Sequence, residues 1–118
     1  MNALPNDVEV SITFLGADEG GRTMSPTRMT SYRPQFHYEG EDWDCAIELP
    51  APITLGKSAK VFVSFQSPEK HHGKLQIGTP FLLREGAKIV AYGAISQIVN
   101  LPRSAQRALE RQAAKANG

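Results

Sequence analysis

The sequence predicts an all-β protein: a closed antiparallel β-barrel of about six strands with a short C-terminal helix. Three observations favour this fold class. Short segments alternate apolar and polar residues, turn residues separate them, and strong helix formers take over near residue 101. A chain of 118 residues fits one such domain. We expect an N-terminal tail over residues 1–6, the barrel over 7–100 and a basic helix over 101–118.

The first strand is predicted over residues 8–14, where four apolar residues alternate with three polar ones. This period of two is typical of a strand with one buried face. Residues 17–31 are rich in Gly, Ser, Thr and Pro, and they are predicted to form a long loop. Loops of this length in small domains often carry function.

Residues 35–38 and 45–49 are predicted to be two further strands, joined by an acidic connector over residues 39–44. Two prolines then break the chain. The next strand is predicted over residues 59–65, where every second residue is apolar and shares one face.

A polar loop is predicted over residues 68–73. A final hairpin follows, with strands over 81–84 and 87–99 around the turn Glu85–Gly86. Gly93 lies inside the last strand, which predicts a bulge or the close approach of another backbone.

A helix is predicted over residues 102–115 because alanine, leucine, arginine and glutamine dominate there. Asn100 is a candidate cap, and a proline is tolerated in the first turn. The apolar face is thin and leaves open whether the helix docks; it consists of Leu101, Ala105, Ala108 and Leu109. Basic residues recur every four positions as a spiralling stripe, made of Arg103, Arg107, Arg111 and Lys115. This stripe is either a solvated face or an RNA contact.

The composition excludes several classes of protein. The formal net charge of +1 favours neither nucleic acid nor membrane binding, so any such contact needs a local patch. A single cysteine, Cys45, allows no internal disulfide. We find no apolar run of signal-peptide or membrane-span character, and we expect a cytoplasmic protein.

Four strings carry a resemblance to a known family: DEGGR at 18–22, YRPQF at 32–36, IELP at 47–50 and LREG at 83–86. In this order and spacing they resemble the C-terminal (third) β-barrel domain of elongation factor Tu, over about residues 7–99. The resemblance implies a stand-alone barrel without the family's GTPase domain. The string LGKS at 55–58 lacks the first glycine of a phosphate-binding loop, so we expect no nucleotide and no cofactor.

The resemblance also implies functional positions. Arg22 matches an arginine that lies close to the tRNA backbone in the family. Gln35, Glu85 and Gly86 match positions at the T-stem contact, and the four matches together favour RNA binding. Three positions depart from the pattern: Asp44 replaces a threonine, Ser67 replaces a lysine, and Lys88 replaces an arginine. An aspartate repels phosphate, so inherited tRNA binding is expected to be weakened.

We therefore expect a non-enzymatic module that binds a protein partner in or around translation, such as a mimic or competitor of the factor's own barrel. The alternative is an RNA-binding module that uses the T-stem surface and the basic helix. The candidate contact residues are Gly21, Arg22, Arg33, Gln35, Arg84, Glu85, Gly86, Lys88, Arg103, Arg107 and Arg111.

We predict no catalytic residue and no metal site. His71 and His72 lack further ligands nearby in sequence, and residues 39–44 lack the order of a calcium loop. Cys45 has no histidine at a recognisable motif distance, so it is not predicted to be a nucleophile.

Overall fold

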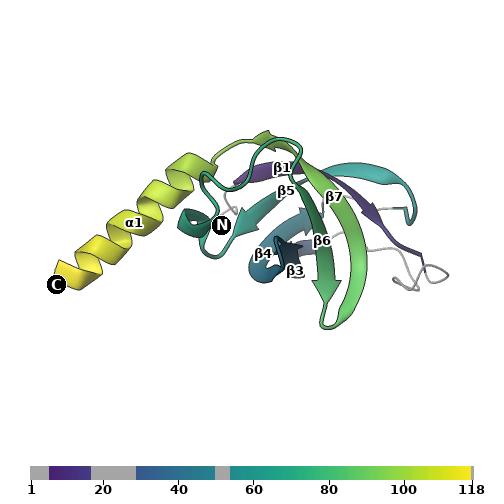
Figure 1. Cartoon of the computed structure of the whole chain (residues 1–118), viewed down its shortest axis with the longest axis horizontal. Helices are drawn as coiled ribbons and strands as arrows, with labels where there is room; N and C mark the ends of the chain where they lie inside the picture. Colours follow the sequence, from purple (N-terminus) through teal and green to yellow (C-terminus); the bar gives the residue numbers. More distant parts are fainter. Residues whose placement is uncertain (1–5, 17–28, 50–53, 118) are drawn as a thin grey trace.

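Seven strands, one short 3₁₀ helix and one α-helix make up the computed structural model, which describes residues 6–16, 29–49 and 54–117 (Figure 1). The strands are β1 (Val8–Phe14), β2 (Met29–Tyr32), β3 (Gln35–Tyr38), β4 (Glu41–Leu49), β5 (Ser58–Phe65), β6 (Pro80–Glu85) and β7 (Lys88–Ile98). The 3₁₀ helix η2 (Pro68–Lys70) lies between β5 and β6, and the helix α1 (Leu101–Asn117) follows β7.

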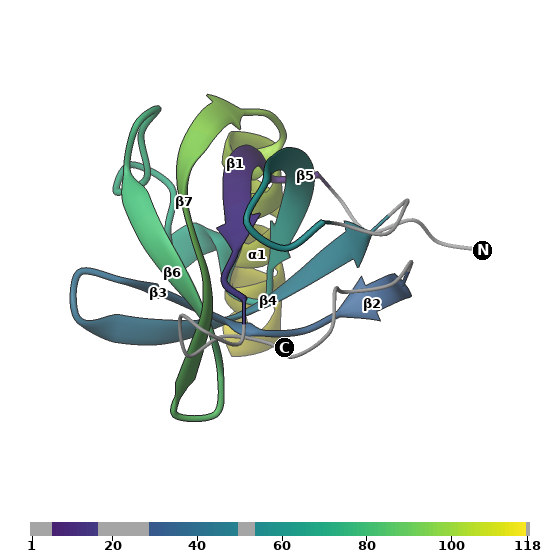
Figure 2. The same ribbon diagram turned by 90° about the vertical axis from the view of Figure 1, so that its right-hand side faces the viewer.

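The strands close into a six-stranded antiparallel barrel, which confirms the predicted fold class. Neighbouring strands follow the order β4-β3-β6-β7-β1-β5, and pairing between β4 and β5 closes the ring. Figure 2 shows the strands curling around the interior. The short strand β2 pairs with β4 where Tyr32 lies opposite Ile47, in line with the pairing of Gln35 and Asp44 in β3 and β4. The chain of β2 and β3 therefore follows one edge of β4.

The barrel interior is filled by the inward residues of each strand. In β1 the four apolar residues are buried and the three polar ones are partly exposed, which confirms the predicted alternation. The ring of Phe36 stacks on Phe81 at a centroid distance of 4.3 Å and meets Phe65 edge-on at 5.0 Å. Offset and edge-to-face ring pairs add about 1 kcal/mol each beyond their buried area.

Gly93 confirms the prediction of a close backbone approach. A Cβ atom at this position would lie 2.2 Å from the carbonyl oxygen of Ser11 and 2.9 Å from the ring of Phe81. Strand β1 pairs antiparallel with β7 at this point, with Gly93 opposite Ile12. Glycine is required here because no side chain fits between the two backbones.

The predicted loop over residues 17–31 is partly wrong, since its last three residues belong to β2. Residues 17–28 lie outside the described part of the chain, and with them the predicted contacts Gly21 and Arg22. The short segment Met29–Tyr32 has too few residues to show a period of two, which is why pattern alone missed it.

The predicted acidic connector is also wrong, because β4 begins at Glu41 and only Glu39–Gly40 form the turn. Both turn residues have positive φ angles, of 51° and 79°. Alternation explains how carboxylates enter a strand: Asp42 and Asp44 point outward and stay exposed, while Cys45 begins the buried part of β4.

The predicted polar loop over residues 68–73 is a 3₁₀ helix followed by a turn, and two of its residues are buried. Pro68 and His71 face the barrel, and His71 is fully enclosed. Its ring packs 4.3 Å from that of Phe65 and 4.7 Å from that of Trp43, measured between centroids. The aromatic contacts of one histidine thus draw this polar segment onto the end of the barrel.

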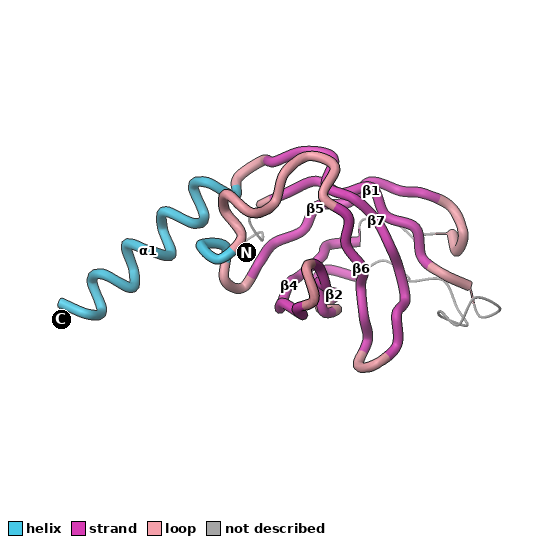
Figure 3. Tube along the Cα trace, viewed as in Figure 1, coloured by secondary structure: helices cyan, strands magenta, loops and turns pink. Residues whose placement is uncertain are grey.

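Helix α1 extends one residue beyond the predicted range at its start and two at its end, and its first turns dock on the barrel (Figures 1 and 3). Leu101, Ala105 and Ala108 are buried, whereas Leu109 is 55% exposed and does not belong to the docked face. Spacings of four and three residues place the first three on one side. Leu109 follows where the docked part of the helix ends, since residues 109–116 are all exposed.

A buried carboxylate, Asp7, anchors this helix. Its Oδ2 accepts a 2.8 Å hydrogen bond from the N–H of Phe65, and its Oδ1 accepts the hydroxyl proton of Ser104. Its backbone carbonyl also accepts the N–H of Leu101. Burial raises the pKa of Asp7, and the two hydrogen bonds act in the opposite direction. Negative charge is favourable near a helix N-terminus, so this position suits an acid.

Candidate functional site

Polar and apolar side chains gather on the outer surface of β3, β4, β6 and β7. We call this surface the β3–β6 face; it consists of Gln35, His37, Asp42, Asp44, Leu82, Arg84, Ile89 and Tyr92. The strand register brings them together. Gln35 lies opposite both Asp44 and Arg84, and Arg84 lies opposite Ile89. In the adjacent row, the partners run from Asp42 through His37 and Leu82 to Tyr92.

The charged groups of this face are paired with one another. Arg84 Nη1 donates to Asp42 Oδ2 at 2.9 Å, and His37 Nδ1 lies 2.7 Å from Asp42 Oδ1. The amide Nε2 of Gln35 donates to Asp44 Oδ1 at 2.9 Å. The carboxylates of β4 therefore engage two of the side chains that the sequence assigned to partner contact. With His37 neutral, the two carboxylates outnumber the single arginine, so the face presents no excess of positive potential to a phosphate backbone.

The apolar part of the face lies beside these pairs. Tyr92 is 49% exposed and Ile89 is 40% exposed, and Leu82 between the strands is partly exposed. A tyrosine and an arginine within one patch are the residue types most enriched at the energetic centres of protein interfaces. The mixture of an apolar strip with a paired polar border is typical of a surface that binds another protein.

The turn between β6 and β7 continues the face. Glu85 and Lys88 are exposed cross-strand partners, and Gly86 between them has a φ of +63°. The hydroxyl of Tyr32 donates to Glu85 Oε2, which ties this turn to the end of β2. Arg33 follows Tyr32 and is exposed. The structure thus brings Arg33, Gln35, Arg84, Glu85, Gly86 and Lys88 into one region.

The structure does not bring the basic helix to this turn. Glu85–Gly86 precedes β7 and α1 follows it, so the eleven residues of β7 separate them along roughly 35 Å of strand. Arg103, Arg107 and Arg111 therefore form a second surface. Ser67 belongs with that second surface, because it lines a hollow together with Arg111 and Lys115.

Cys45 and His71 are both structural. Burial, and next the Asp44 carboxylate, raise the pKa of the Cys45 thiol to about 12, while Arg33 acts in the opposite direction. A buried thiol of this pKa is a poor nucleophile.

Across the described ranges, no group of three or more His, Cys, Asp or Glu residues is placed to hold a metal ion. His71 was expected to lie in a polar loop, and no signal in the sequence marks it as buried.

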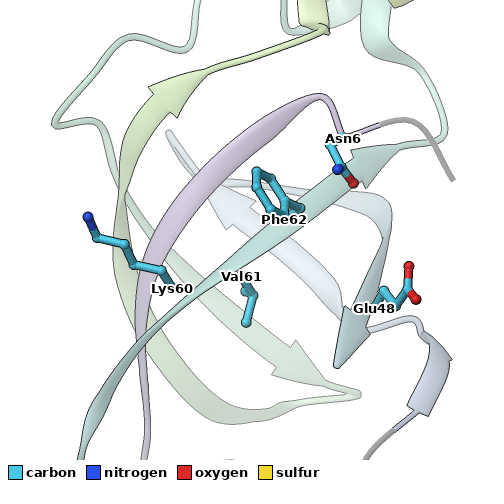
Figure 4. Close-up of a pocket in the computed structure, with 5 residues that line it drawn as sticks. All are labelled: Asn6, Glu48, Lys60, Val61 and Phe62. Atoms are coloured by element: carbon cyan, nitrogen blue, oxygen red, sulfur yellow. The ribbon is translucent and has the colours of Figure 1, made fainter. Parts of the chain in front are cut away.

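One more hollow lies where β4 and β5 separate. It has a volume of about 260 Å³ and is lined by Asn6, Glu48, Lys60, Val61 and Phe62 (Figure 4). Phe62 is 40% exposed on the outer side of β5. The sequence analysis named none of these residues. This hollow offers few contacts to a ligand, mainly one apolar ring and two side chains of opposite charge. Strand β1 lies between it and β7, so the hollow is not part of the β3–β6 face.

No protein-family model matches the chain. The likeness to the barrel domain of elongation factor Tu rests on the four sequence strings, with which a closed six-stranded barrel is compatible. In the part of the chain that the structure describes, no helix has the length and apolar character to cross a bilayer.

Proposed function

We propose that this chain is a non-enzymatic binding module of the cytoplasm that engages a protein partner in or around translation through the β3–β6 face. The observation that carries this proposal is the register that joins Gln35 and Arg84 with exposed Ile89 and Tyr92 in one patch. The resemblance to the third domain of elongation factor Tu suggests the partner. It is a protein that meets the factor's own barrel: its GTPase domain, its exchange factor or a toxin that targets it.

A protein fits this face better than the T-stem of tRNA does. Phosphate binding requires cations that are available to neutralise it. On this face the Arg84 guanidinium is paired with Asp42, and the Gln35 amide is used by Asp44. Two exposed carboxylates beside the contact repel a phosphate backbone. A protein partner instead gains from the desolvation of Tyr92 and Ile89, with the ion pair as a polar border.

The test is to titrate the protein with elongation factor Tu, and separately with its exchange factor, and to measure binding by calorimetry at low and physiological salt. The interface variant is Arg84→Ala with Tyr92→Ala. Its matched control is Phe62→Ala, which removes a similarly exposed ring from β5. Central tyrosine and arginine residues of interfaces contribute about 2 kcal/mol or more, so the double variant is expected to bind at least roughly 30-fold more weakly. The control is expected to bind like the wild type.

Aminoacyl-tRNA forms the second arm of the experiment. Binding to a translation factor with little tRNA affinity supports the proposal. Tight tRNA binding that Arg84→Ala abolishes would show that the inherited T-stem surface still functions despite Asp44. Absence of binding in both arms, or equal loss in the Phe62→Ala control, refutes the proposal.

A further inference from the structure

A groove runs along helix α1 on the side that faces the barrel end. Its two parts share Gln66 and Arg111 and together follow the helix over three turns. The lining residues are Asp7, Phe65, Gln66, Ser67, Pro68, Glu69, Ser104, Arg107, Ala108, Arg111, Gln112 and Lys115. The groove therefore has a helical wall that carries Arg107, Arg111 and Lys115, and an opposite wall made of residues 66–69.

The cations of this wall have no partner among the described residues. Among the described residues, the ion pairs join His37 and Arg84 to Asp42, and Lys74 to Glu39. None of them involves α1. Glu110 is the single acidic residue of the helix, against four basic ones. The opposite wall offers one partly exposed carboxylate, Glu69, which accepts the Gln112 amide at 2.8 Å. The other carboxylate of the lining, Asp7, is fully buried and is hydrogen-bonded to Phe65 and Ser104, so two carboxylates face three cations. The groove thus keeps an excess of positive charge.

The spacing of these cations is regular. Arg107, Arg111 and Lys115 follow one another at four-residue intervals, which is about 6 Å of helix axis per step and about 12 Å in all. The docked first turns position the start of this row, because Ser104 and Ala108 on either side of Arg107 are buried. A linear array of cations on a fixed helix suits a ligand with repeated negative charges.

We propose that this groove binds the phosphate backbone of a single-stranded nucleic acid, without regard to base sequence. The other lining groups favour phosphate: the Gln66 amide and the Ser67 hydroxyl are of the kinds that commonly contact phosphate oxygens. An acidic peptide would need apolar anchors, and the groove offers only Pro68, Ala108 and the buried edge of Phe65. The row of cations is only about 12 Å long. A single strand suits it, because its flexible backbone can follow a basic groove of this kind beside residues 66–69.

The lining also explains why base identity has no influence. Single-strand binders commonly gain further affinity by stacking bases on exposed aromatic rings, and modest base preferences arise from differences in stacking strength. Among the described residues that line this groove, the one aromatic ring, Phe65, is 5% exposed. Affinity therefore comes from counterion release, and it falls steeply with salt. This surface is separate from the β3–β6 face, so its binding does not depend on the function proposed above.

The test measures fluorescence anisotropy of a labelled uridine oligonucleotide of about 12 nucleotides, within the usual site size of such proteins. Affinity is recorded between about 50 and 200 mM salt. The groove variant is Arg107→Gln, Arg111→Gln and Lys115→Gln. The control variant, Lys57→Gln, Lys60→Gln and Lys74→Gln, removes three exposed charges from the barrel and gives the same net charge. Circular dichroism checks that both variants are folded.

Three phosphate contacts predict a slope of about −2 in log K against log salt for the wild type. The groove variant is expected to lose at least roughly tenfold in affinity and most of the slope, while the control variant keeps both. Equal loss in the two variants overturns the proposal, since net charge alone would then explain binding. Tighter binding of a duplex RNA, or displacement of the oligonucleotide by polyglutamate at equal charge, overturns it as well.

Discussion

Protonation of His71 is predicted to destabilise the fold. Its Nδ1 lies 2.6 Å from the hydroxyl oxygen of Tyr38, and its Nε2 has no hydrogen-bond partner among the described residues. A protonated ring carries an N–H at both nitrogens and therefore buries a charge with an unsatisfied donor. Burial, and next the Lys74 ammonium, lower the pKa of His71 to about 4, and Glu69 acts in the opposite direction.

The magnitude follows from the difference between this pKa and the unperturbed value of about 6.5. Because the folded-state pKa is lowered, the unfolded chain takes up the proton first as the pH falls. The stabilising effect of neutral His71 is thus complete above about pH 6.5 and is lost progressively down to about pH 4. Between pH 7 and pH 5 the loss amounts to about 2 kcal/mol in the free energy of unfolding.

Urea unfolding of the wild type and of His71→Phe at pH 7 and pH 5 measures this effect. His71→Phe keeps an aromatic ring in the site and removes the titrating group. Asp7 has a raised pKa, so its contribution has the opposite sign and favours the folded state as the pH falls. It is common to both proteins and cancels in their difference.

The matched control is His72→Gln, because His72 is the exposed neighbour of His71. The control is expected to lose stability with falling pH as the wild type does, whereas His71→Phe is expected to lose about 2 kcal/mol less between pH 7 and pH 5. Parallel pH profiles for the wild type and His71→Phe would refute the reasoning.

Three further predictions concern single positions. Gly93→Ala places a Cβ atom 2.2 Å from the backbone of β1, so it is expected to lower the free energy of unfolding in urea by about 3 kcal/mol. Gly86→Ala strains φ but has open space around it, and it is expected to cost about 1 kcal/mol. Equal losses would contradict the close contact at Gly93. Asp7→Ala leaves the buried N–H of Phe65 unpaired and is expected to cost about 2 kcal/mol and to speed amide exchange in the first turn of α1, whereas Asp7→Asn restores much of both. Cys45, with a buried thiol, is expected to resist iodoacetamide in the folded protein and to react once urea unfolds it; rapid labelling in the folded state would show that β4 opens.

Local pattern sufficed for the elements whose residues alternate or repeat over a long enough stretch. The period of two predicts β1 and β5, the turn Glu85–Gly86 predicts the hairpin of β6 and β7, and helix propensity predicts α1. The close approach at Gly93 was also predictable, because a glycine inside a strand often marks a bulge or a place where another backbone comes close. The predictions failed at β2 and at the start of β4, where four residues were too few to show a pattern and carboxylates imitated a loop.

The candidate site was only partly predictable. The sequence proposed Gln35 and Arg84 as contact residues, but not that the register would place them opposite one another with Asp42 and Asp44 as their partners. Exposed Tyr92 was not singled out, because an aromatic residue in a strand is more often part of the core. The anchoring carboxylate of Asp7 gave no signal either, since an acidic residue before a strand is ordinary.

What the sequence alone determined is therefore the barrel class, the approximate limits of β1, β5, β7 and α1, and the basic stripe of the helix, because each depends on neighbours along the chain. The tertiary structure decided which charges are neutralised and which remain available. Asp42 pairs with Arg84, which follows it by 42 positions, and Asp7 meets Ser104 at a separation of 97 positions. Such pairings follow from strand register and barrel closure, which place distant segments side by side. The register therefore pairs Arg84 with Asp42 on the β3–β6 face, whereas the basic residues of α1 meet no acidic partner among the described residues and keep their charge available.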